Sequence, residues 1–381
     1  MAKLGMPTVV VKFIEAGIEA IQRSQRGIVA LILEDTKQVI DKLATKTNGH
    51  EVLPNPFLVY TVDDIPEELS DKNKDYILKA LKGYNKPPLK VVVYMMQQGG
   101  DKAGADKFQE PLKAMLTERF DYLAIPTIET AQLEYVATWV KTARENKFKK
   151  IKVVLPGYNA DYEGVINFGN TKVVTADREY KAAEYTARIA GLVAGTNMTQ
   201  SATYAPLTEV IDCDRHTQDE MDTMVNEGKF FIWYDGEKFK MSRAMNSLVT
   251  TSQGKLEGYQ TIKIVDIMDM IYDDIRKTAQ DSYIGKYTND YENKCLLISA
   301  ILGYFKQLEN ERLLQKDYST CEIDCEAVRT YQLSHGLFTK EELAKMSDDE
   351  VKKLDTKKIV FLKAKVRPLD AMEDIQLPIN I

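Results

Sequence analysis

The sequence predicts a protein of mixed α/β and α+β class, in which an α/β insertion domain accompanies a C-terminal α+β core domain and a β-strand arm extends from each end. Between residues 90 and 195, short apolar runs alternate with segments of helical periodicity. After residue 229, a hairpin pattern is followed by long amphipathic helices. At both ends of the chain, apolar residues recur with a period of two. The length of 381 residues also exceeds what one hydrophobic core usually supports.

The C-terminal stretch has the alternation of a half-buried strand. Its large aliphatic residues share one parity and are Ile375, Leu377, Ile379 and Ile381. Pro378 lacks an amide proton, which favours an edge position in a sheet. Near the other end, Val9, Val11 and Phe13 repeat the pattern. Each arm is expected to complete a sheet in its own subunit or in a neighbouring one, and the pattern alone leaves both alternatives open.

The middle of the chain has the pattern of a mostly parallel sheet covered by helices. Strands are expected at Arg26–Asp35, Val91–Met95, Tyr122–Pro126, Ile151–Pro156 and Lys172–Thr175. Helices are expected over Asp71–Gly83, around Phe108, Leu112 and Met115, around Leu133, Val136, Val140 and Ala143, and over Asp177–Ala194. The last of these helices has a face of small residues, Ala183, Ala187, Ala190 and Ala194. This face is expected to pack closely against the core, and the alternative is that it packs against another subunit.

The C-terminal part begins with a hairpin pattern over Lys229–Lys240, with Asp235 and Gly236 in the turn. A long helix follows, and its buried face is expected to carry Ile264, Met268, Ile271 and Ile275. Another helix is expected from about Asp290 to Leu308, and a last strand from Lys358 to Val366.

Three acidic residues of the first long helix, Asp266, Asp269 and Asp273, are spaced so that they lie along one side of it. This side is expected either to be solvated or to meet a basic partner. General acid–base chemistry is not expected, because no histidine or phosphate-binding loop accompanies the carboxylates.

Composition and motifs narrow the class of protein. The net charge of −6 argues against a general nucleic-acid binder. The N-terminal segment is not expected to be a signal peptide, no apolar run is long enough for a membrane span, and the four cysteines form no disulfide scaffold. These features favour a soluble protein made in a reducing cytoplasm. No phosphate-binding loop, dinucleotide fingerprint, zinc-protease motif or nucleophile elbow occurs in the sequence, and no cofactor is expected.

The histidines and cysteines are expected to have structural roles. His50, His216 and His335 lie far apart in the chain, each in a polar setting. Cys321 and Cys325 are spaced like one half of a zinc site, but no second matching pair follows.

Several stretches together resemble the contractile tail sheath proteins of bacteriophages, in particular the short sheaths of Gram-positive prophages and contractile bacteriocins. In the N-terminal half they are Gly5–Phe13, Arg26–Leu33, Asp161–Phe168, Ala187–Gly195 and Ser201–Leu207. In the C-terminal half they are Asp235–Lys238, Arg243–Leu248, Met268–Ile271, Tyr283–Lys286, Phe361–Ala364 and Leu369–Asp374. The segment Asp355–Lys358 departs from the glycine-containing turn that the family has before its last strand.

The resemblance implies a structural subunit without catalysis. Such subunits form stacked six-fold rings around an inner tube, and their arms link neighbours by strand addition. A baseplate signal converts the metastable extended sheath into a shorter form that drives the tube through a cell envelope. The implied partners are further copies of the chain, the inner tube protein, and baseplate and tail terminator proteins, with no nucleic acid and no membrane insertion. Assembly is expected in the bacterial cytoplasm, as part of a phage tail or bacteriocin particle.

The resemblance also implies a division of the chain. Residues 1–20 and 367–381 are the expected linking arms, and residues 21–89 are expected to pack with the core. Residues 90–196 are the expected outer α/β domain, and residues 197–366 the expected core domain facing the tube. Asp266, Asp269 and Asp273 would then meet a basic stripe on the tube.

Two other classes of protein are alternatives to a sheath subunit. A soluble α/β enzyme with a nucleotide or small-molecule pocket is compatible with the fold class. An inner tube protein is disfavoured, because tube subunits are small and barrel-like whereas this chain is long and has a large α/β part.

Overall fold

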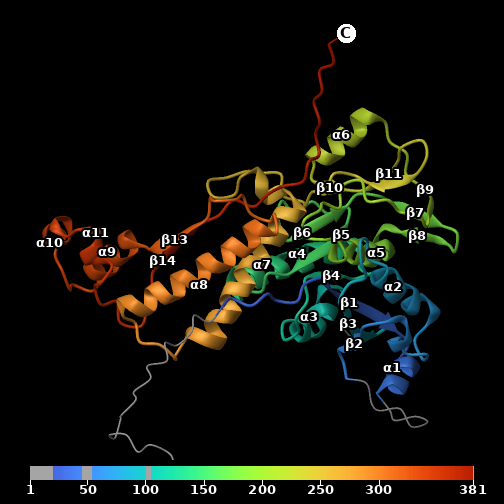
Figure 1. The fold of residues 1–381 in the computed structure, drawn as a ribbon. Coiled ribbons are helices and arrows are strands. Elements are labelled where there is room, and N and C mark those ends of the chain that lie inside the picture. The colour runs from blue at the N-terminus through green and yellow to red at the C-terminus, as the bar shows by residue number, and fades with distance from the viewer. Residues whose placement is uncertain (1–19, 45–53, 100–103, 381) are drawn as a thin grey trace, which may run out of the picture. The chain divides into compact units, whose positions relative to one another are not determined.

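A computed structural model describes residues 20–44, 54–99 and 104–380 (Figure 1). The described chain divides into two compact units. The sheet unit comprises residues 23–273 together with 368–380, and the helical unit comprises residues 20–22 together with 274–367. The boundary at residue 273 falls within helix α7 (Ile262–Thr278).

The sheet unit is built on a seven-stranded sheet with the strand order β10-β6-β5-β4-β1-β3-β2 among the described residues (Figure 1). Its strands are β1 (Ile28–Asp35), β2 (Phe57–Val59), β3 (Lys90–Gln97), β4 (Tyr122–Ala124), β5 (Lys152–Pro156), β6 (Val165–Phe168) and β10 (Lys229–Phe230). All neighbouring pairs are parallel except β2, which runs antiparallel to β3. The expected mostly parallel sheet is therefore confirmed.

Helices cover both faces of this sheet, because alternate residues of each buried strand point to opposite sides. In β1, Val29 and Leu31 belong to a core shared with α2 (Asp71–Leu81) and α5 (Ala182–Ala194). Their neighbours Ile28 and Ala30 belong to a second core shared with helices α3 and α4. The remaining helices of this part of the chain are α1 (Lys37–Leu43), α3 (Gln109–Met115) and α4 (Leu133–Asn146). This arrangement is a three-layer α/β/α sandwich.

The small residues of α5 serve close packing in the core of the unit. At Gly191, a Cβ atom would lie 2.0 Å from the carbonyl oxygen of Ala80 in α2. The two helices therefore approach each other more closely than any other residue at position 191 would allow. This contact confirms the core interpretation of the small-residue pattern.

Smaller elements complete the sheet unit. A separate sheet has the order β8-β7-β9, and β11 and β12 form the expected hairpin. The bounds are β7 (Lys172–Thr175), β8 (Glu179–Lys181), β9 (Val210–Cys213), α6 (Gln218–Asn226), β11 (Ile232–Tyr234) and β12 (Phe239–Met241). The residues before the hairpin, Lys229 and Phe230, pair with β6 of the large sheet instead of joining the hairpin.

In the helical unit, the end of α7 is followed directly by a π-helical turn at Ala279–Tyr283. Its further elements are α8 (Tyr291–Asn310), β13 (Thr320–Ile323), α9 (Cys325–Ser334), α10 (Lys340–Lys345), α11 (Asp348–Val351) and β14 (Leu362–Lys365). Ile323, Val328 and Val351 form its small apolar core. Before β14, Lys357 has a φ of 55°, and its amide donates to the Asp355 side chain at 2.7 Å. Lys357 thus adopts the left-handed conformation at the turn where the family was expected to have glycine.

Several boundaries differ from the sequence-based expectation. The helix expected from Asp177 begins only at Ala182, because Glu179–Lys181 pair with β7 as strand β8. The last strand is limited to Leu362–Lys365, and β6 and β13 were not expected. The large sheet also takes strands from both sides of the expected boundary at residue 89, since β1 pairs with β3 and β4. In the described part of the chain, no helix is long and apolar enough to cross a membrane.

Candidate functional site

The C-terminal arm extends from the body of the sheet unit with its apolar side chains in solvent. Residues 366–380 contain no helix and no strand. The side chains of Ile375, Leu377 and Ile379 are 84%, 75% and 76% exposed. Ile381 lies outside the described residues, as do Val9, Val11 and Phe13 of the N-terminal arm. Within one chain, the described arm therefore leaves its alternating aliphatic side chains uncovered.

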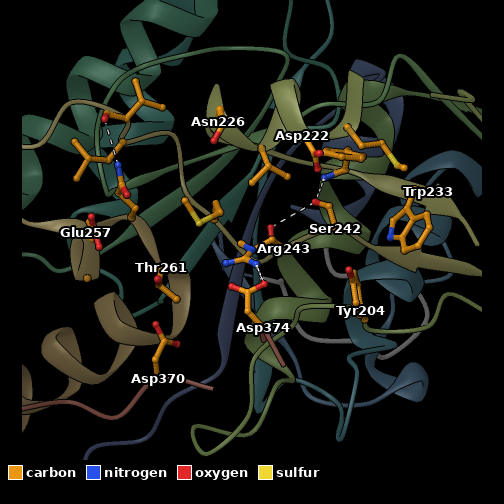
Figure 2. A pocket seen from close by; sticks show the side chains of 18 of the residues that line it. Tyr204, Asp222, Asn226, Trp233, Ser242, Arg243, Glu257, Thr261, Asp370 and Asp374 are labelled. Atoms are coloured by element: carbon orange, nitrogen blue, oxygen red, sulfur yellow. Dashed lines mark hydrogen bonds and ion pairs between the residues drawn. The ribbon is translucent and has the colours of Figure 1, made fainter. Parts of the chain in front are cut away.

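The first part of the arm, residues 368–374, is held to the body of the sheet unit; we call it the arm root. The buried ammonium of Lys263 donates to the carbonyl oxygen of Leu369 at 2.6 Å. The Glu373 carboxylate accepts from the hydroxyls of Ser201 at 3.0 Å and Thr203 at 2.6 Å. Arg243 forms ion pairs with the two acidic residues that end the root, with Glu373 at 3.5 Å and with Asp374, and Figure 2 shows its contact with Asp374. The chain is thus fixed as far as Asp374 and exposed beyond it.

The helical unit carries a second feature that is suited to strand pairing. Strands β13 and β14 form an antiparallel pair in which Cys321 lies opposite Ala364. In the part of the chain that the structure describes, no third strand joins this pair. Residues Lys363, Ala364 and Lys365 of β14 are exposed. An isolated two-stranded ribbon is marginally stable and offers unpaired backbone groups along both outer edges.

The three aspartates of α7 do not form a free acidic surface. Asp269 is 3% exposed, and both of its carboxylate oxygens accept from Arg144 at 2.9 Å. Lys152 reaches the same carboxylate at 2.7 Å and that of Asp266 at 2.9 Å. The expectation that these residues are solvated or face a basic partner is therefore wrong for Asp269. Its basic partners belong to its own chain and come from sequence positions more than a hundred residues away.

The amino ends of neighbouring parallel strands bring these groups together. Tyr122 at the start of β4 lies opposite Lys152 at the start of β5, and its hydroxyl donates to Asp266. Arg26, just before β1, donates to Asp121 at 2.8 Å and to Asp273 at 2.8 Å. Asp121 also accepts from the amides of residues 27 and 28, which ties the start of β1 to β4. The buried charge cluster consists of Arg26, Asp121, Arg144, Lys152, Asp266, Asp269 and Asp273.

Burial and charge act differently on the carboxyl groups of this cluster. Burial alone would raise the pKa of Asp269, but Lys152 and Arg144 outweigh it and hold that pKa well below its usual range. Burial raises the pKa of Asp266, even though Lys152 and Tyr122 favour its ionised form. Burial also raises the pKa of Asp273, against the attraction of Arg26. The cluster therefore joins α7 to the sheet through three carboxyl groups whose pKa values are shifted in different directions.

The buried face of α7 also differs from the expected one. Ile264 is buried, but Met268, Ile271 and Ile275 are only half-buried. Val265, Ile267, Asp269 and Met270 are among the residues of α7 that are almost completely covered. The apolar periodicity predicted the wrong side of α7 as buried, because charged residues occupy part of the buried face.

An open groove of about 890 Å³ lies beside the arm root, and Figure 2 shows its lining. Tyr204, Phe231 and Trp233 supply aromatic surface, and the acidic residues around it are Asp222, Glu257, Asp370 and Asp374. The hydroxyl of Ser242 accepts from the amide of Phe231 at 3.0 Å, so it is committed to local structure. None of the described residues that line it is a histidine, cysteine or lysine.

The remaining candidate residues are placed within the fold. His335 stacks on Tyr331 with ring centroids 4.0 Å apart, and His216 contacts Phe231 edge to face. His50 lies outside the described residues. Cys321 and Cys325 are buried free thiols, and the described residues contain no cluster of His, Cys, Asp and Glu that could hold a metal ion.

Comparison with known proteins gives consistent matches over the chain. Residues 101–247 match the family model described as the phage tail sheath protein central domain, and residues 255–381 match that of the phage tail sheath C-terminal domain. Over 382 aligned residues the chain is 33% identical to the tail sheath protein of Clostridium phage phiCD119, with 99% of each chain covered. It is also 30% identical to the phage-like element PBSX protein XkdK of Bacillus subtilis, over 47% of this chain and 40% of that protein.

Solved structures show the same fold at lower identity. A sheath tail protein from Desulfitobacterium hafniense is 19% identical with a TM-score of 0.67, covering 83% of this chain and 94% of that one. The helical sheath protein of the anti-feeding prophage in its contracted state is 13% identical with a TM-score of 0.68, covering 99% of both chains.

Proposed function

This chain belongs to the phage tail sheath family and is a structural subunit of a tail sheath, and we propose that its terminal arms bind neighbouring copies and hold the sheath together. The observation that carries the proposal is the C-terminal arm, whose aliphatic residues are exposed beyond a firmly held root. Such alternating apolar side chains are suited to strand addition, in which backbone hydrogen bonds give affinity and alternate side chains give specificity.

The two-stranded ribbon of β13 and β14 is the acceptor that we propose for an arm. Pairing would add strands to a ribbon that is marginal alone and would satisfy the backbone groups along its edges. The N-terminal arm, with Val9, Val11 and Phe13, would use the other edge of a ribbon in another copy.

Each arm would contribute little by itself. Burying three aliphatic side chains yields about 5–9 kcal/mol. Ordering the backbone of the arm costs about 1–2 kcal/mol per residue, which is of the same size over its length. The net contribution per arm is then close to zero before new backbone hydrogen bonds are counted, so a stable sheath would depend on many repeated arms.

The finer features of the particle belong to the same proposal. The subunits would stack as six-fold rings around an inner tube and contract from a metastable extended state. Baseplate and tail terminator proteins would bind the ends of the stack, and assembly would take place in the bacterial cytoplasm. The C-terminal part of the chain would face the tube and the α/β part would lie outside, with the arms as the connections between copies. The matching family and relatives are tail sheath proteins, which supports a structural role without catalysis.

Deleting residues 375–381 tests the linking role. The truncated protein should keep its circular dichroism spectrum and elute as a monomer in gel filtration, and negative-stain microscopy should show no tubes. Val62→Ser is a control. Val62 is 58% exposed, so this substitution also removes an apolar surface group but leaves both ends of the chain unchanged. Tubes of normal length and yield from the truncated protein would overturn the proposal.

A further inference from the structure

The contacts of the arm root with the sheet unit end abruptly at Asp374. Glu373 has a side chain that is 13% exposed, whereas the side chains on either side of it are open: Asp374 is 74% exposed and Met372 is 94% exposed. One carboxylate oxygen of Glu373 accepts both hydroxyl hydrogen bonds, from Ser201 and Thr203. Glu373 is therefore the residue of the root with the most complete polar surroundings.

The hydroxyls that hold Glu373 are themselves oriented by the backbone. The amide of Thr203 donates to the Ser201 hydroxyl at 3.1 Å, and the amide of Ala244 donates to the Thr203 hydroxyl at 2.9 Å. Each hydroxyl is thus oriented by a backbone amide; the two oxygens also lie 2.8 Å apart, so one hydroxyl can donate to the other while its neighbour donates to the carboxylate. The turn at residues 201–203 is thus a preformed socket for an acidic side chain.

The other two attachments differ in strength. Lys263 is 5% exposed and holds the start of the root through the Leu369 carbonyl. The ion pair between Arg243 and Asp374 is mostly solvated, since these side chains are 39% and 74% exposed, and contributes little. Glu373 in its socket and Lys263 on Leu369 therefore fix the two ends of the root.

We infer that the Glu373 socket anchors the C-terminal arm at a defined point of the sheet unit and thereby limits which neighbouring copy the arm can reach. The inference rests on the proposed linking role of the arm. Residues 375–381 span at most about 25 Å when fully extended, whereas residues 368–381 would span about 50 Å if the root were released. Anchoring also orders the root before association, so that only the residues beyond Asp374 lose freedom on binding.

Limited proteolysis of the full-length, unassembled protein tests the anchor without reference to assembly. Chymotrypsin cleavage after Leu369, whose carbonyl accepts from Lys263, requires the root to detach locally. Glu373→Ala should accelerate this cleavage by about tenfold or more, because its socket hydrogen bonds are lost. Asp374→Asn, the matched control at the next residue, should change the rate less than about twofold. Glu373→Gln retains an acceptor oxygen and should restore part of the protection. Equal cleavage rates in Glu373→Ala and the unmodified chain would overturn the anchor.

Electron microscopy of the same variants tests the limit on neighbour selection. Glu373→Ala should give fewer or irregular tubes, while Asp374→Asn should give regular ones. If deletion of residues 375–381 abolishes tubes but Glu373→Ala assembles normally, the selection role is refuted and the linking function stands. If the deletion itself assembles normally, the linking function fails whatever the proteolysis shows.

Discussion

Arg144 and Asp269 form a bidentate ion pair, in which the two terminal guanidinium nitrogens each lie 2.9 Å from a carboxylate oxygen. Their side chains are only 5% and 4% exposed, so neither charge can be solvated if the other is removed. Lys152, with a side chain 1% exposed, depends on the same carboxylate. Asp269 is therefore the residue on which the buried charge cluster is centred.

Replacing this carboxylate should be costly. Asp269→Asn removes the carboxylate that Arg144 and Lys152 share; Lys152 retains Asp266, but Arg144 loses its bidentate partner, and we expect the free energy of unfolding of the sheet unit to fall by about 3–5 kcal/mol. Asp273→Asn should cost about 1 kcal/mol or less, because Asp273 is partly solvated and Arg26 retains Asp121. Urea unfolding followed by tryptophan fluorescence measures both, since Trp139 and Trp233 lie in the sheet unit. Similar losses in the two variants would contradict the central role of Asp269.

Asp266 should make stability depend on pH in the opposite sense to an ordinary ion pair. Its pKa is raised by burial, so between the unfolded pKa of about 3.9 and the folded value the folded chain holds more protons. Its contribution to stability is complete below that unfolded pKa and is lost as pH rises through the folded pKa. Asp266→Asn, which cannot ionise, should therefore gain stability relative to the unmodified chain as pH increases from 4 to 7.

Urea midpoints at several pH values in this range measure the effect of Asp266. The difference between the variant and the unmodified chain isolates Asp266 from other groups that titrate. A constant difference across the range, or one that shrinks with rising pH, would show that the Asp266 carboxylate is not destabilised by burial.

The contact between α5 and α2 gives a stability prediction with an internal control. Gly191→Ala places a Cβ atom against the Ala80 carbonyl and should destabilise the chain by about 2 kcal/mol or more, because a backbone atom must move. Gly303 lies in helix α8 with no neighbouring atom within 4 Å of such a Cβ. Gly303→Ala should therefore stabilise the chain by about 0.5–1 kcal/mol. Thermal unfolding followed by circular dichroism distinguishes the two signs.

The sequence allowed the layered α/β part to be predicted because local apolar patterns report directly on buried strands such as Val91–Val93. It did not allow the charge cluster to be predicted. Arg144, Lys152 and Asp269 are each ordinary surface residues by type, and only the pairing of β4 with β5 and the packing of α7 bring them together. The prediction of which side of α7 is buried was wrong for the same reason. An aspartate is expected on the solvated side of a helix unless the basic residues that pair with it are known.

The parity of the C-terminal arm leads to the sharpest test of its role. If the arm pairs as a strand, the aliphatic residues of odd number would pack on the acceptor and the even-numbered residues would face away. Ile375→Ser, Leu377→Ser and Ile379→Ser together should prevent tube formation, since they remove the apolar surface while keeping the length of the arm. Gln376→Ser with Asn380→Ser alters the opposite face and should leave assembly yield within about twofold of the unmodified chain. Sedimentation of assembled material and negative-stain microscopy give the two yields, and equal impairment by both sets of changes would show that the arm does not act as a one-faced strand.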